Sequence, residues 1–432
     1  RSRQRQMCIR DRTKRSALNK RIFLSLFFFK QVKMIYRLTG QVQHYAWGGR
    51  NNIASLIGLN SAKDQPCAEW WLGAHPSAPS EIENASNKQS LIEFLSQNPT
   101  ALGQASRQQF GDELPYLLKI LDVEKPLSIQ LHPTKDQAEK GFEAENAKGL
   151  ALTDSTRTYK DRNHKPEMMI ALSDFWLLHG FKTKAQILAI LNERPALQPL
   201  AEKLSTQNLA EFYADVMLAD QSTLANWLLP IIEANQQPYK NGELALDNPD
   251  YWVLYTMEAM AISPEKLDAG LVCFYLFNIV HLKEGEGIFQ DAGIPHAYLR
   301  GQNVELMACS DNVIRGGLTP KYVDIVELLK IVDCREVIPQ IISAAPQNQS
   351  EFTYKTPVKD FALAQIRLEP EQHSEVNLQS AGILLVMQGE LKIQEKSTAL
   401  TLKQGESAFI TAGSVVEIES EKGGYAFLAK LP

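Results

Sequence analysis

Apolar and polar residues alternate over short distances from Met34 to about residue 183, which predicts β-strands separated by tight turns. Two stretches, 88–110 and 134–147, have helical spacing instead, and Thr134 is expected to cap the second of them. The predicted strands lie at 36–38, 67–72, 115–123, 126–133, 167–172 and 175–181.

The apolar spacing changes at Lys184. Apolar residues then recur every third or fourth position as far as about Ala261, which predicts a helical segment over 184–263. From Gly270 the short strand pattern returns, with strands expected at 271–282, 285–290 and 297–308.

After Val332 the sequence becomes rich in Pro, Gln and Ser, and a linker is expected near 336–350. The remaining residues alternate strands with Gly-containing turns, which predicts a small antiparallel barrel or jelly roll. This last module contains one histidine, His373, so we expect no metal in it.

The first 33 residues differ from the rest, because they contain eleven Lys or Arg and a single acid. The apolar run 22–29 is too short to span a bilayer, and no small-residue cleavage site follows it. We therefore interpret 1–33 as an atypical basic leader outside the fold and expect the native chain to start at Met34.

Charge and cysteine content narrow the class of partner. The formal net charge of −5 argues against nucleic acid or a membrane as a partner. For the same reason, an anionic substrate would need a local cluster of positively charged side chains. The five cysteines are scattered without a C-x-x-C pair, which favours a reducing, cytoplasmic environment. Any metal must then be held by His, carboxylate or amide groups.

Four polar side chains are candidates for such a metal site. Gln130 and His132 are two residues apart in a predicted strand, so both heads point to the same face. Glu167 begins the next strand, and we prefer it to His164, where the chain should turn. His296 follows the turn at Pro295. The set suits zinc or another divalent ion. The alternative interpretations are that Gln130 and His132 form a polar strand face and that His296 has a structural role.

Several motifs resemble those of the type I mannose-6-phosphate isomerases, also called phosphomannose isomerases, of the cupin superfamily. The resemblance extends from Met34 to about residue 335, and its motifs occur in the family's order. They are Tyr45-Ala46-Trp47-Gly48, Glu69-Trp70-Trp71-Leu72-Gly73, Leu127 through Pro133, Asn163-His164-Lys165-Pro166-Glu167, and Gly293 through Pro320. One departure is Gln290-Asp291, where many relatives have apolar or small residues.

The resemblance implies a mainly β fold of cupin or jelly-roll barrels with an α-helical insertion. Residues 34–183 and 264–335 would form the catalytic cupin domain, 184–263 the helical domain, and 336–432 a C-terminal cupin-like barrel. It also implies one Zn²⁺ per chain, held by Gln130, His132, Glu167 and His296.

The activity implied is the interconversion of mannose 6-phosphate and fructose 6-phosphate through a cis-enediolate. Arg315 would be a catalytic residue that stabilises the developing negative charge. The base that carries the proton is either Glu305 or Lys165, and a lysine can act only if its pKa is lowered. The residues expected to contact the sugar phosphate are Ser128, Tyr298 and Lys321.

Two other classes of protein remain as alternatives. A cupin metal oxygenase would use iron with two histidines and a carboxylate, but Gln130 and the cations argue against it. A non-catalytic carbohydrate-binding barrel would not need Glu305, Arg315 and Lys321 in this arrangement. We expect a cytoplasmic monomer that binds a sugar phosphate.

Overall fold

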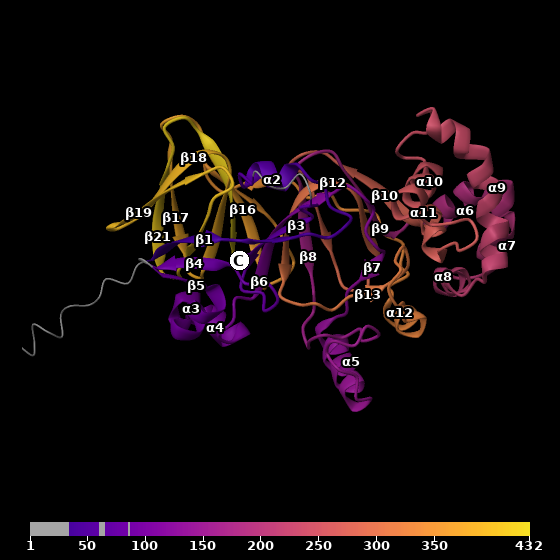
Figure 1. The fold of residues 1–432 in the computed structure, drawn as a ribbon, viewed down its shortest axis with the longest axis horizontal. Coiled ribbons are helices and arrows are strands. Elements are labelled where there is room, and N and C mark those ends of the chain that lie inside the picture. Colours follow the sequence, from indigo (N-terminus) through magenta and orange to yellow (C-terminus); the bar gives the residue numbers. More distant parts are fainter. Residues whose placement is uncertain (1–33, 60–64, 85–86) are drawn as a thin grey trace, which may run out of the picture.

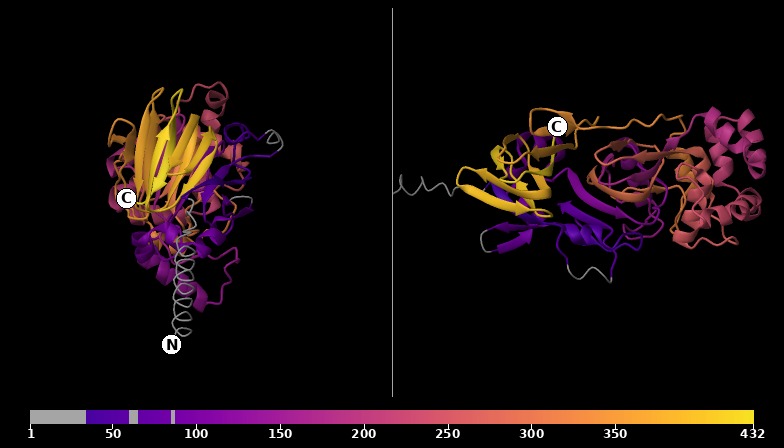
Figure 2. Two further views of the ribbon diagram at one scale, coloured as in Figure 1. Left: turned by 90° about the vertical axis from the view of Figure 1, so that its left-hand side faces the viewer. Right: turned by 90° about the horizontal axis from the view of Figure 1, so that it is seen from above.

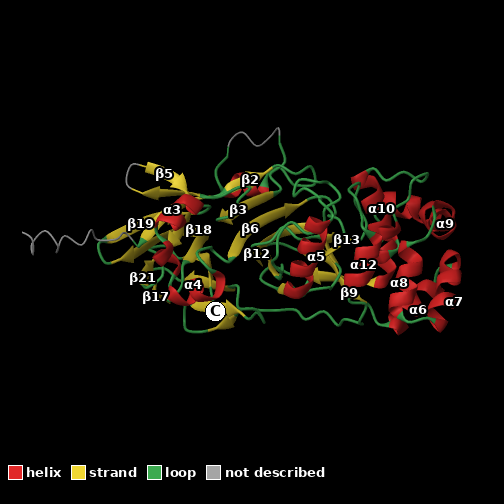
Figure 3. Ribbon diagram, turned by 90° about the horizontal axis from the view of Figure 1, so that it is seen from below, coloured by secondary structure: helices red, strands yellow, loops and turns green. Residues whose placement is uncertain are grey.

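The computed structural model describes residues 34–59, 65–84 and 87–432. The leader predicted at 1–33 lies outside the described residues. Two large antiparallel sheets and a group of helices follow one another along the long axis of the molecule, with the helices at one end (Figures 1 and 3). The predicted mainly β fold with a helical insertion is confirmed.

Within the described residues the middle sheet has ten strands. Its longest strand, β12 (His296–Ala308), pairs with β6, β7, β8 and β9. Because β12 has four partners, side chains on it lie near side chains from distant parts of the chain. The other strands are β2 (Gln41–Gln43), β3 (Glu69–Gly73), β6 (Tyr116–Val123), β7 (Gln130–Leu131), β8 (Glu167–Ala171), β9 (Phe175–Phe181), β10 (Phe277–Leu282), β11 (Gly287–Gln290) and β13 (Ile314–Arg315).

The second sheet has twelve strands in the part of the chain that the structure describes, and most of them come from its C-terminal part. β1 (Ile35–Thr39) pairs with β20, so the first described strand belongs to this sheet although it lies in the range predicted for the catalytic domain. The others are β4 (Glu81–Asn84), β5 (Asn87–Ser90), β14 (Ala345–Pro346), β15 (Glu351–Tyr354), β16 (Ala362–Leu368), β17 (His373–Leu378), β18 (Gly382–Glu395), β19 (Thr398–Lys403), β20 (Ser407–Ile410), β21 (Ser414–Glu419) and β22 (Gly424–Lys430).

The predicted helical segment is confirmed, and it packs against the middle sheet through one continuous core. Its elements are α6 (Lys184–Asn192), η2 (Pro195–Leu197), α7 (Gln198–Thr206), α8 (Leu209–Met217), α9 (Gln221–Lys240) and α10 (Pro249–Met260). Figure 3 shows these helices gathered beside β9. The division into three domains stays a proposal.

The remaining helices lie outside this segment. Thr134 caps α5 through a capping box with Gln137, as predicted, and α5 projects from the molecule (Figure 1). The helices are α2 (Asn52–Leu56), α3 (Leu91–Gln97), η1 (Pro99–Leu102), α4 (Gln104–Phe110), α5 (Lys135–Ala147), η3 (Ala269–Leu271), α11 (Cys273–Leu276) and α12 (Ile325–Ile331).

Two predicted strands differ from the structure. The run 271–282 begins as η3 and α11 before it becomes β10, because a continuous apolar run has no period that separates a buried helix from a strand. The strand at 126–133 is reduced to β7. The backbone N–H groups of Leu127 and Ile129 donate to different partners, the carbonyls of Tyr298 and Gly317.

We call the part of the chain that forms the ten-stranded sheet the middle module. Side chains alternate between the two sides of its strand β6. Tyr116, Leu118 and Ile120 face the core between the two sheets, so Lys119 faces the opposite way, into the middle module. After α12 an extended segment runs back beside the middle sheet to β14 (Figure 2). Among the described residues, no helix is both long and apolar enough to cross a membrane.

Candidate metal centre

Three buried side chains from three strand ends converge in the middle module. One carboxylate oxygen of Glu167 lies 3.4 Å from His132 Nε2, and the other lies 3.4 Å from His296 Nε2. The ligand atoms of the three residues all lie within 4.8 Å of one another. His132 directly follows β7, whereas Glu167 begins β8 and His296 begins β12, so the sheet itself brings them together.

The hydrogen bonds of the two imidazoles fix which nitrogen faces the cluster. Nδ1 of His132 lies 2.9 Å from the carbonyl oxygen of Asn312, and Nδ1 of His296 lies 2.9 Å from that of Ile294. A carbonyl can only accept, so each Nδ1–H donates and each Nε2 keeps its lone pair. Both Nε2 atoms are buried without a hydrogen-bond partner, as expected for metal ligands.

Burial and neighbouring charges keep His132 and Glu167 in the protonation states that a cation requires. Burial lowers the pKa of His132 to about 4, so its imidazole is neutral at pH 7. Burial alone would raise the pKa of Glu167, but the positive charge of Lys165 lowers it well below its usual range. The Nζ of Lys165 lies 2.8 Å from the Glu167 carboxylate.

Strand register places Gln130 beside this cluster. Gln130 lies directly opposite His296 in β12 and directly opposite Arg315 in β13. Directly opposite residues of antiparallel strands point to the same face. The row continues to His179, which is opposite His296 on the other side. The amide of Gln130 is therefore on the side of the sheet that carries the imidazole of His296.

A second buried cluster lies farther along β12, and the sequence did not predict it. Lys119 Nζ lies 3.3 Å from Glu69 and 3.6 Å from Glu305. Trp71 Nε1 donates to Glu69, and the Tyr298 hydroxyl donates to Glu305 at 2.7 Å. A lysine within the apolar run 115–123 was the available signal, because a charged residue there must be paired.

Protonation in this second cluster follows from burial and from the paired charges. Burial would lower the pKa of Lys119, but Glu69 and Glu305 raise it, so the ammonium stays charged. Burial and the neighbouring charge of Glu167 raise the pKa of Glu305 to about 7. This carboxyl group can therefore take up and release a proton near neutral pH.

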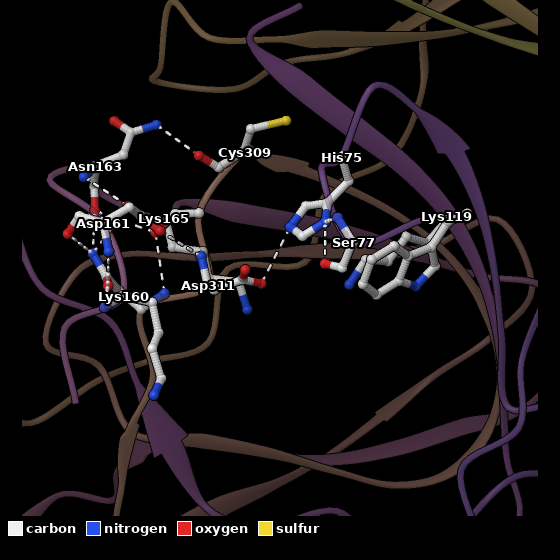
Figure 4. A network of polar contacts seen from close by, with 12 residues as sticks. His75, Ser77, Lys119, Lys160, Asp161, Asn163, Lys165, Cys309 and Asp311 are labelled. Carbon is white, nitrogen blue, oxygen red and sulfur yellow. Dashed lines mark hydrogen bonds and ion pairs between the residues drawn. The ribbon is translucent and has the colours of Figure 1, made fainter. Parts of the chain in front are cut away.

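His75 forms the edge of the site beside the second cluster. Its Nε2 lies 3.2 Å from Asp311, and the ring packs edge-on against Trp71. Figure 4 shows His75 directed at Asp311, with Lys119 on the other side of the imidazole. His164 lies outside the metal cluster, because its Nε2 is 2.7 Å from Asp360.

The other predicted site residues differ in how close they lie to the cluster. Arg315 is half-buried, and no carboxylate among the described residues forms an ion pair with it, so its guanidinium is free for an anion. Ser128 is half-buried two residues before Gln130. Tyr298 is fully buried with its hydroxyl on Glu305, whereas Lys321 is exposed beyond the turn that follows Arg315.

Replacing Lys119 with methionine should lower the free energy of unfolding by about 3 kcal/mol, because two buried carboxylates lose their common cation. Urea denaturation measures this change. Lys403→Met is the matched control, since Lys403 is exposed and its carboxylate partner is 4.0 Å away. The control should change stability by less than about 0.5 kcal/mol. Equal effects of the two substitutions would contradict the buried cluster.

Two imidazoles and a carboxylate at the strand ends of a jelly-roll module define a metal-binding cupin protein. Residues 35–184 match the family model "Phosphomannose isomerase type I, catalytic domain", and residues 350–421 match "Mannose-6-phosphate isomerase, cupin domain". The chain belongs to the type I mannose-6-phosphate isomerase family.

The chain is similar to known proteins over most of its length. The mannose-6-phosphate isomerase of Escherichia coli K12 is 37% identical over 386 residues, which cover 87% of this chain and 94% of the relative. The Homo sapiens enzyme is 31% identical over 417 residues, covering 89% and 95%. A mutant phosphomannose isomerase from Salmonella typhimurium superimposes with a TM-score of 0.83 at 34% identity, covering 92% and 100% of the two chains. A zinc-bound mannose 6-phosphate isomerase gives a TM-score of 0.81, with the same identity and coverage.

Proposed function

We infer that this chain is a zinc-dependent isomerase that interconverts mannose 6-phosphate and fructose 6-phosphate. The observation that carries this conclusion is the buried cluster of His132, Glu167 and His296, with both Nε2 atoms free, in a chain of this family. Family membership supports the substrate, and the donor set supports zinc, which imidazole and carboxylate ligands suit.

We propose that Gln130, His132, Glu167 and His296 hold the zinc. The set carries one negative charge, so a bound zinc ion would keep a net positive charge and supply electrophilic stabilisation for oxygen atoms of the substrate. Lys165 adds positive charge beside Glu167 and orients that carboxylate. Arg315 lies on the same row of the sheet as Gln130 and can bind either the substrate oxygens or the phosphate.

We propose that Glu305 is the base that transfers the proton. As a carboxylate it would take the proton from C2 of the open-chain aldose, and the C–H electron pair would form the C1–C2 double bond of the enediolate. The hydroxyl proton of O2 would then pass to O1, and the same carboxyl group would return the carbon-bound proton to C1 as the carbonyl forms at C2. Glu305 is better suited than Lys165, whose ammonium is engaged with Glu167. Tyr298 and Lys119 hold the Glu305 carboxyl group in place.

The pH dependence of kcat/KM tests Glu305. The base must be ionised, and its pKa is raised to about 7, so kcat/KM should rise with pH and level off above this pKa. A bound zinc ion near Glu167 would move that limb to lower pH, never higher. Glu305→Gln should lower kcat about 10²- to 10⁴-fold. If this variant keeps more than half of the activity, another group is the base.

The proposal also covers a phosphate subsite, the oligomeric state and the cellular compartment. Ser128 and Lys321 flank the strand and the turn that carry Gln130 and Arg315, so they are proposed to contact the phosphate. The exposed Lys321 would have to fold towards Arg315 to do so. We further propose that the protein is a monomer and that it acts in the cytoplasm; the free cysteines among the described residues support a reducing compartment.

Incubation with mannose 6-phosphate in deuterated water tests the function directly. An isomerase that works by proton transfer should form fructose 6-phosphate, part of which carries solvent deuterium at C1, and a chelator should stop the reaction. An oxygenase would instead consume oxygen with iron present and form no ketose. A binding protein would be stabilised by mannose 6-phosphate without converting it. Either of these two results would refute the isomerase assignment.

A further inference from the structure

The turn that carries Arg315 has a backbone conformation that must be held by its surroundings. Gly317 has a φ of +114°, and the next residue, Leu318, has a φ of +53° although it is fully buried and carries a side chain. A left-handed conformation is disfavoured for leucine and persists only where neighbouring structure enforces it. We call residues 315–319 the Arg315 turn.

On one side the turn is bound to the segment that leads into β7. The Gly316 N–H donates to the Ile129 carbonyl at 2.7 Å, and the Ile129 N–H donates to the Gly317 carbonyl at 3.0 Å. These two bonds place Arg315 opposite Gln130. They fix one face of the turn and leave its other face to be supported from elsewhere.

That other face rests on Asp268, in the segment that returns from the helices to the sheet. One oxygen of Asp268 accepts from the Gly270 N–H at 2.7 Å, and the other accepts from the Thr319 N–H at 3.3 Å. The Arg315 turn packs so closely against the segment of Asp268 and Gly270 that neither Gly317 nor Gly270 could carry a side chain. A Cβ on Gly317 would lie 2.9 Å from an Asp268 oxygen, and a Cβ on Gly270 would lie 2.8 Å from the Leu318 nitrogen.

We propose that Asp268 is a positioning residue that holds the Arg315 turn, and with it the guanidinium, at the substrate site. Its carboxylate joins the start of η3 to the end of the turn, so a change there shifts the backbone that carries Arg315. This gives the chain that returns from the helical segment a role in catalysis, and the kinetic part of the proposal rests on the proposed isomerase function.

A double-mutant cycle between Asp268 and Arg315 tests the proposal. Asp268→Ala should lower kcat about 10- to 100-fold, because a displacement of about 1 Å costs that much. In an Arg315→Ala background the same substitution should lower kcat less than twofold, since no guanidinium remains to be positioned. Asp268→Asn keeps the volume and one acceptor oxygen, so it should recover part of the loss. Independent, multiplying losses would overturn the proposal.

The matched control is Asp220→Ala, which removes another aspartate N-cap, the one that accepts from the Thr223 N–H at the start of α9. It should leave kcat within twofold of the unaltered chain. Amide hydrogen exchange provides a readout that needs no activity. Asp268→Ala, and not Asp220→Ala, should speed exchange over 313–320. If Asp268→Ala leaves exchange over 313–320 unchanged, the proposal is overturned. If Asp268→Ala speeds exchange there but the unaltered chain has no isomerase activity, only the proposed function is refuted.

Discussion

Replacing His132 with alanine should remove the bound zinc and abolish the isomerase activity. His132 Nε2 is a buried nitrogen that faces Glu167, and it is one of only two imidazole nitrogens in the cluster that the described residues form. Removing an outer-shell partner of a metal typically lowers affinity by 10- to 100-fold, so losing a direct ligand should lower it by more than about 100-fold. Elemental analysis of the purified variant measures the zinc content.

His373→Ala is the control for this substitution. His373 is an exposed histidine in β17 of the second sheet, far along the chain from the cluster. The control should keep one zinc per chain and full activity. A His132→Ala variant that still holds zinc at nearly one per chain would refute the ligand assignment.

Arg315→Ala should lower kcat by about 10²- to 10³-fold while the zinc content stays at one per chain. Removing one preorganised donor for a developing negative charge has a cost of this size. Arg315 belongs to β13, and none of the three side chains of the cluster forms an ion pair with it, so the bound metal should not respond to its loss. Steady-state kinetics and elemental analysis on the same preparation separate the two effects.

Arg315→Lys shows whether charge alone is sufficient. Lysine keeps the positive charge but lacks the planar pair of donors, so activity should return only in part. If Arg315→Ala keeps more than a tenth of the activity, the guanidinium does not stabilise charge in the reaction. If Arg315→Lys is fully active, the planar donor geometry is unnecessary.

The proposed metal ligands could be selected from the sequence because each has a local sequence signal. Gln130 and His132 have strand spacing before Pro133, and Glu167 and His296 each follow a proline at the start of a strand. The helical segment could be predicted for a similar reason, since its amphipathic spacing is a local property of the sequence. Distant packing was not needed for either conclusion.

The second cluster could not be predicted from the sequence, because it depends on register between distant strands. Lys119 meets Glu305 only because β6 and β12 pair at that position, and it meets Glu69 only because β3 lies on the other side of β6. Tyr298 was predicted to contact the sugar, and a sequence cannot show that its hydroxyl is taken by Glu305. The pairing of β1 with β20 is equally remote along the chain.

Stepwise addition of zinc to the metal-free chain tests most directly whether His132, Glu167 and His296 share one catalytic ion. Activity with fructose 6-phosphate, measured in a coupled assay, should rise in proportion to added zinc and stop rising at one equivalent per chain. Full activity in the metal-free chain, or one bound zinc that leaves the rate unchanged, would contradict the account.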